Sequence, residues 1–98
     1  MSARPSITAA IKQARQHVAL VQFGRQWQVN TWSEKHRAWW QGQPTDYAKA
    51  RATASATVVA GALQALGVEG WEAMTLSDRH SAGSVRARVM AALREVDA

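Results

Sequence analysis

The chain has 98 residues, a length that suits one domain, and it contains no cysteine, so no disulfide and no thiolate ligand or nucleophile is available. Hydrophobic residues make up 47% of the sequence, and no run approaches the roughly 20 apolar residues of a membrane span. The segment Met1–Pro5 leads into a periodic helical pattern rather than an apolar signal core, so we expect a cytoplasmic protein.

The net charge of +5 is unevenly distributed along the chain. Residues 1–52 carry a net charge of +6, and residues 53–98 carry −1. Such asymmetry is typical of a protein with an anionic partner, although a well-solvated surface would produce the same count. Arginine outnumbers lysine by nine to three and alanine is abundant, as is common in high-GC bacteria and their phages, so we expect a bacterial or phage source.

The first predicted element is a helix over residues 6–17. Ser6 is a suitable N-cap because its hydroxyl can accept a hydrogen bond from an unpaired amide of the first turn. Lys12 and Arg15 fall outside the apolar stripe and are expected to point toward solvent. The stripe itself repeats with helical spacing: Ile7, Ala10, Ile11, Ala14 and Val18.

The next pattern predicts a β-hairpin. Residues 18–23 form a short apolar run, and residues 26–32 alternate between polar and apolar side chains. Gly24 stands at the first of the two connecting positions, where a type II′ turn requires a positive φ. The alternation places Trp27, Val29 and Thr31 on one face and Trp32 on the other.

A third strand over residues 37–41 or an irregular loop would fit the segment that follows the hairpin. If the segment is extended, the adjacent Trp39 and Trp40 point to opposite faces of the sheet. Gly42 and Pro44 end the segment. The sequence does not decide between the strand and the loop. It also does not show which face of the sheet each tryptophan occupies.

A long helix is predicted over residues 46–66, with Thr45 as its N-cap and Gly67 as the left-handed residue that ends it. The segment 68–80 is mixed, and its Trp71 and Met74 are expected to pack beneath the body of the protein. Apolar residues at 85, 89, 93 and 96 then predict a last helix over residues 83–96.

These elements predict a single small α+β domain of residues 1–98. Its order is a helix, an antiparallel β-hairpin or three-stranded meander, a long helix packed on the sheet, and a short C-terminal helix. We expect the long helix to cross one face of the sheet and to bury Trp27 and Val29. The first and last helices should complete the helical layer.

The first functional hypothesis is a non-enzymatic accessory protein that binds DNA or RNA through a basic, tryptophan-containing sheet surface. Basic residues at the turns and at the start of the long helix would contact phosphates, and an exposed tryptophan would stack on bases. The predicted contact residues are Arg25, Trp32, Lys35, Arg37, Trp40, Lys49 and Arg51. The alternative is that the charges are solvated and that the tryptophans serve packing.

The second hypothesis is a protein-interaction module, either a homodimer or an inhibitor of a host protein, from a phage or mobile element. Five tryptophans are many for a core of this size, and exposed aromatic residues are frequent at interface centres. An open sheet edge at residues 18–23 or 37–41 could pair with a second copy. An apolar patch without nearby charge would favour this hypothesis over nucleic acid.

Catalytic and metal sites are weakly indicated. A catalytic triad could be imagined from four residues that are close in sequence: Ser77, Asp78, His80 and Ser81. A triad is defined by spatial geometry rather than by sequence proximity, so we interpret these residues as a loop and a helix cap. His17, His36 and His80 lack the paired spacing of metal ligands. We therefore expect no enzymatic activity, no cofactor, no metal, no small-molecule substrate and no membrane association.

Overall fold

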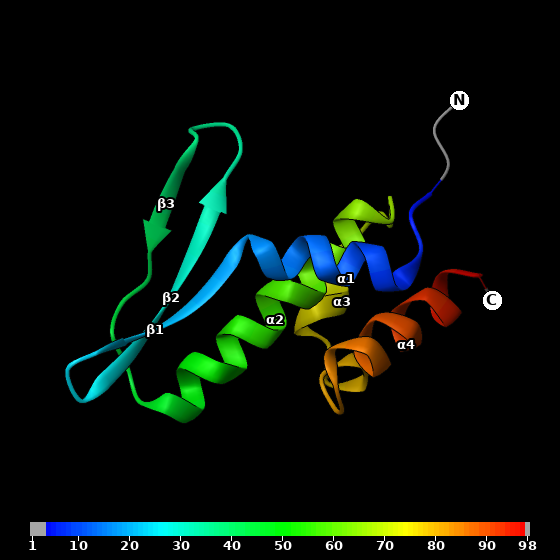
Figure 1. The fold of residues 1–98 in the computed structure, drawn as a ribbon. Coiled ribbons are helices and arrows are strands. Elements are labelled where there is room, and N and C mark those ends of the chain that lie inside the picture. The colour runs from blue at the N-terminus through cyan, green and yellow to red at the C-terminus, as the bar shows by residue number, and fades with distance from the viewer. Residues whose placement is uncertain (1–3, 98) are drawn as a thin grey trace.

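A computed structural model of the protein describes residues 4–97; the shorter helices gather at one end, the three-stranded sheet extends to the other, and the long helix runs from the sheet to the other helices (Figure 1). The prediction for the segment Met1–Pro5 falls partly on residues 1–3, which lie outside the described residues. The elements in chain order are α1 Ile7–Gln16, β1 Val18–Phe23, β2 Gln26–Ser33, β3 Ala38–Gln41, α2 Tyr47–Ala65, α3 Trp71–Leu76, the 3₁₀ helix η1 Asp78–His80, and α4 Val85–Asp97.

Side-chain caps fix the starts of the long helices. The Ser6 hydroxyl accepts a hydrogen bond from the Ala9 amide at 3.1 Å, as predicted for α1. The N-cap of α2 is Asp46 rather than the predicted Thr45, since the Asp46 carboxylate accepts from the Lys49 amide at 2.9 Å. Thr45 is not available for this role because its backbone pairs with Trp27 of β2.

The end of α2 is closed by a left-handed glycine. Gly67 has a φ of 73°, and its amide donates to the carbonyl of Gln64 at 3.0 Å. The amide of the next residue, Val68, donates to the carbonyl of Leu63 at 3.1 Å. These two bonds form a Schellman motif and confirm the predicted end of the helix.

The predicted hairpin and the third strand are both present. Strands β1 and β2 pair without interruption from Val18↔Thr31 to Phe23↔Gln26. Gly24 has a φ of 64° and Arg25 does not have a positive φ, as a type II′ turn requires. The antiparallel order is β1-β2-β3, which confirms the meander and excludes the loop alternative for the third strand.

The chain continues to pair with β2 after β3 ends. The Gly42 amide donates to the Val29 carbonyl at 2.9 Å, and Trp27 and Thr45 exchange two backbone bonds of 2.8 Å. Two residues, Gln43 and Pro44, therefore stand opposite one residue of β2, which makes a β-bulge. Proline is tolerated at a bulge because no ladder hydrogen bond is needed from its nitrogen.

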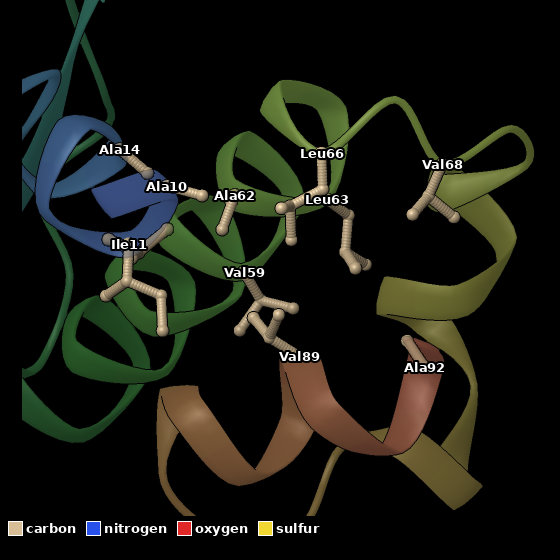
Figure 2. Packing of buried hydrophobic residues seen from close by; sticks show 11 residues of the cluster. Ala10, Ile11, Ala14, Val59, Ala62, Leu63, Leu66, Val68, Val89 and Ala92 are labelled. Carbon is tan, nitrogen blue, oxygen red and sulfur yellow. The ribbon is translucent and has the colours of Figure 1, made fainter. Parts of the chain in front are cut away.

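The fully buried core lies among the helices (Figure 2). Helices α1 and α4 both pack against α2, and Leu63 and Val59 of α2 lie at the centre of the cluster. Trp27 and Val29, predicted to be buried beneath the long helix, are only half-buried. The cluster consists of Ala10, Ile11, Ala14, Val58, Val59, Ala62, Leu63, Leu66, Val68, Val89 and Ala92.

Trp71 and Met74 pack against this core from the short helix α3, which the sequence pattern did not predict. Ser84 caps α4 by accepting a hydrogen bond from the Ala87 amide at 3.2 Å. Among the described residues, none of the helices combines the length and the apolar character needed to cross a bilayer.

Candidate functional site

The two faces of the sheet have different surroundings. The inner face contacts α2, where the Trp27 and Tyr47 rings meet edge to face with centroids 5.1 Å apart. The strand register and the alternation of side chains assign every sheet residue to one face. The inner face carries Val18, Leu20, Gln22, Trp27, Val29, Thr31, Ser33, Ala38 and Trp40. The opposite face, called here the open face, carries Ala19, Val21, Phe23, Gln26, Gln28, Asn30, Trp32, Trp39 and Gln41.

The open face has no charged residue within the described sheet and exposes apolar side chains. Phe23 is 62% exposed and Trp39 is 48% exposed, and Val21 is also exposed. The rings of Trp32 and Trp39 are in edge-to-face contact with centroids 5.6 Å apart. An uncharged surface with exposed aromatic rings is suited to a protein partner rather than to a phosphate backbone.

The two edges of the sheet are also different. The β3 edge is short, at four residues, and is followed by the bulge with Pro44 and preceded by Arg37. Short strands, bulges, prolines and charges are the features that protect an edge from pairing with another chain. The β1 edge has six residues in unbroken register and contains neither a charge nor a proline. Strand β1 is therefore the unprotected edge.

The seven residues predicted to contact a partner do not form one surface. Lys35 and Arg37 lie in the loop between β2 and β3, at the opposite end of the sheet from the β1–β2 turn (Figure 1). Arg25, Lys49 and Arg51 lie at the other end, at the β1–β2 turn and the start of α2. The eight residues of β2 separate the two groups, a distance of about 25 Å.

The two predicted stacking residues lie on opposite faces. Trp32 is half-buried on the open face beside Trp39, while Trp40 pairs with Thr31 on the inner face. Trp40 lies beyond the part of the sheet that α2 covers and is 56% exposed. One face of the sheet therefore cannot present both tryptophans, because Trp32 pairs with Trp39 and Trp40 is the next residue along β3.

The loop residues 34–37 together with Trp40 form a smaller basic group, called here the distal tip. The Trp40 and His36 rings are in edge-to-face contact with centroids 5.5 Å apart. Arg37 has a φ of 49°, a left-handed conformation that is uncommon for a residue with a side chain. The Glu34 carboxylate lies 3.3 Å from His17 Nε2, which ties one side of the tip to the end of α1.

No family model, no curated protein and no solved structure matches this chain.

Among the residues considered for a triad or metal site, His80 serves the packing of α4. His80 is buried, and its Nε2 lies 2.5 Å from the Glu95 carboxylate, while its carbonyl accepts a hydrogen bond from buried Arg88 Nε at 3.0 Å. His80 Nδ1 is buried without a hydrogen-bond partner. The side chain of Asp78 lies outside the described part of the structure. In residues 4–97, no three potential metal ligands gather among the side chains that are described.

A basic groove between α1 and α4 was not found from the sequence. It has a volume of about 450 Å³ and is lined by Thr8, Ile11, Lys12, Arg15, Gln16 and Arg86. The helical pattern placed Lys12 and Arg15 toward solvent, and Arg86 is more than 70 positions away in the chain. Only the packing of α4 against α1 brings the three cations together, and no local sequence signal reports that packing.

Proposed function

We propose that this protein is a protein-interaction module that forms a homodimer by pairing β1 with β1 of a second copy. Such pairing joins the two three-stranded sheets into one continuous antiparallel sheet and places the two open faces side by side. The observation that carries the proposal is the unprotected, uncharged β1 edge next to an exposed aromatic face.

The backbone groups needed for this pairing point outward. The Trp32 amide donates to the His17 carbonyl at 2.8 Å, so these two residues form a hydrogen-bonded pair. Hydrogen-bonded pairs alternate along an antiparallel ladder, so the amides of Val18, Leu20 and Gln22 point away from β2. These outward amides and carbonyls are the donors and acceptors that a second copy of β1 would use.

The charge distribution favours a second copy at this edge over any other surface of the sheet. Each copy carries a net charge of +5, and like charges placed together at an interface cost free energy. The distal tip and the start of α2 carry several of these charges, whereas β1 and the open face carry none. Two copies can therefore meet along β1 with little electrostatic repulsion.

Replacing Gln22 by proline is expected to convert the dimer to a monomer. Proline removes a backbone amide of β1 that would donate a hydrogen bond to the second copy. It removes no hydrogen bond between β1 and β2, because the Gln22 amide does not point toward β2. Size-exclusion chromatography with light scattering should give a dimer mass for the unmodified protein at about 100 μM and a monomer mass for Gln22→Pro.

The matched control is Gln41→Pro, which removes an outward amide at the β3 edge and should leave the dimer intact. A second variant, Phe23→Glu, introduces a charge on the open face next to the β1 edge and should also weaken the dimer. Circular dichroism confirms that each variant is folded. A monomeric unmodified protein, or equal dimer masses for Gln22→Pro and Gln41→Pro, would contradict the proposal.

A second candidate function is nucleic-acid binding through the distal tip, whose loop carries Lys35 and Arg37 and whose exposed Trp40 ring packs on His36. Replacing Lys35 and Arg37 by glutamine should weaken binding to duplex DNA or RNA at about 50 mM salt. The slope of log K against log salt should fall by about two, one for each phosphate that the variant no longer neutralises. Fluorescence anisotropy measures both quantities. An unchanged slope, or no binding by the unmodified protein, would exclude the tip as a nucleic-acid site.

A further inference from the structure

The groove between α1 and α4 concentrates positive charge without a carboxylate in its lining. Thr8, Lys12 and Arg15 follow one another at intervals of four and three residues, so they line one face of α1. Arg86 faces them from the first turn of α4, and its Nη1 donates to the Thr8 hydroxyl at 2.9 Å. The hydroxyl therefore fixes one guanidinium at the side of a groove whose other side carries two more cations.

The cations of this groove have no carboxylate partner among the side chains that the structure describes. Among the side chains that are described, Lys49 and Arg79 each pair with a carboxylate, but Lys12, Arg15 and Arg86 take part in none of the ion pairs. Neither α1 nor α4 has an acidic residue in its first turn, and Arg86 stands at the positive end of the α4 dipole. Lys12 and Arg15 are three residues apart on one helix face, a spacing at which like charges repel, and a bound anion would relieve this repulsion.

We propose that this groove binds a phosphate group of a ligand. Guanidinium groups match the tetrahedral oxygens of phosphate with paired hydrogen bonds, and lysine adds a point charge. The groove has a volume of about 450 Å³, within the range of small-ligand sites, and Ile11 supplies an apolar wall beside the cations. The same chemistry would be offered by a free polyphosphate, by a nucleotide or by the backbone of a nucleic acid.

Isothermal titration calorimetry at about 50 mM salt tests the proposal with three probes: inorganic pyrophosphate, ATP and a short DNA duplex. The double variant Lys12→Gln/Arg15→Gln should bind the effective probe at least about tenfold more weakly than the unmodified protein. The matched control is Lys49→Gln/Arg51→Gln, which removes the same charges from the start of α2 and should retain the affinity.

The pattern across the probes identifies the source of the phosphate. If the groove variant loses binding of pyrophosphate and ATP, the ligand is a free polyphosphate or a nucleotide. If the variant loses binding of the duplex alone, the ligand is a nucleic-acid backbone. Backbone amide shifts in the NMR spectrum should move for residues 8–16 and 84–88 on binding. Equal affinities of groove variant and control, or no binding of any probe at about 1 mM, would overturn the proposal. Gln22→Pro should leave this binding unchanged, so the test is independent of dimer formation.

Discussion

Replacing Leu63 by alanine is expected to lower the free energy of unfolding by about 3–5 kcal/mol, the cost of deleting a fully buried leucine side chain and leaving a cavity. Leu63 has no exposed surface and lies in the cluster where α1, α2 and α4 meet (Figure 2). A small domain has a total stability of about 5–15 kcal/mol, so the variant should be close to its unfolding threshold at room temperature. Urea denaturation followed by circular dichroism measures the change.

The matched control for this change is Leu76→Ala. Leu76 is 84% exposed at the end of α3, so the same deletion removes almost no buried apolar surface. The expected cost is below about 0.5 kcal/mol, as for most surface substitutions. Similar costs for the two variants would show that the helical cluster is not the centre of the core.

The second large effect is expected for Gly42→Ala, which should destabilise the protein by about 2–3 kcal/mol. A methyl group at this position would lie 2.5 Å from the backbone oxygen of Val29, closer than real contacts allow. The Val29 oxygen belongs to the ladder and accepts the Gly42 amide bond of 2.9 Å, so neither group can move without breaking the pairing. Thermal unfolding followed by tryptophan fluorescence detects the destabilisation.

Gln43→Ala provides the control for Gly42→Ala, because Gln43 is exposed and already carries a Cβ in the bulge. Its expected effect is within about 0.5 kcal/mol of the unmodified protein. Should Gly42→Ala be equally stable, the close approach between the bulge and β2 would not exist in solution.

Local signals in the sequence predicted most of the elements. Gly24 marked the first hairpin because only a residue without a Cβ easily takes the required positive φ, and Gly67 marked the end of α2 for the same reason. The N-cap of α2 was misplaced by one residue because Thr45 and Asp46 are both good caps. The choice between them depends on a backbone pair with Trp27 that is distant in the sequence.

The position of the core could not be read from the same patterns. Trp27 and Val29 have the alternation of a buried sheet face, but α2 covers only part of that face, and the fully buried side chains that α2 packs against come from α1, α4 and Val68. The short helix α3 was also missed, since its N-cap Gly70 makes no side-chain capping bond and six residues are too few for a periodic signal.

The candidate surfaces likewise depend on how distant parts of the chain pack, which local sequence patterns do not report. The sequence correctly indicated that Trp39 and Trp40 point to opposite faces, because alternation is a local property of a strand. The sequence did not show that Arg25 and Arg37 lie at opposite ends of the sheet. A count of charges along the chain does not tell at which end of a sheet each charge lies. The protected and unprotected edges became distinct only when the strand order and the Pro44 bulge were known.

The location of the core among the helices has a consequence for how this protein can change over evolutionary time. Because the fully buried cluster takes its side chains from the helices and the segment that follows α2, substitutions at the exposed positions of the open face alter few of the interactions that hold the fold. Phe23 can therefore be exchanged for other residues at small cost in stability, whereas Trp39 also packs against Trp32. The helices hold the fully buried cluster together, so the exposed positions of the sheet can vary without loss of that cluster.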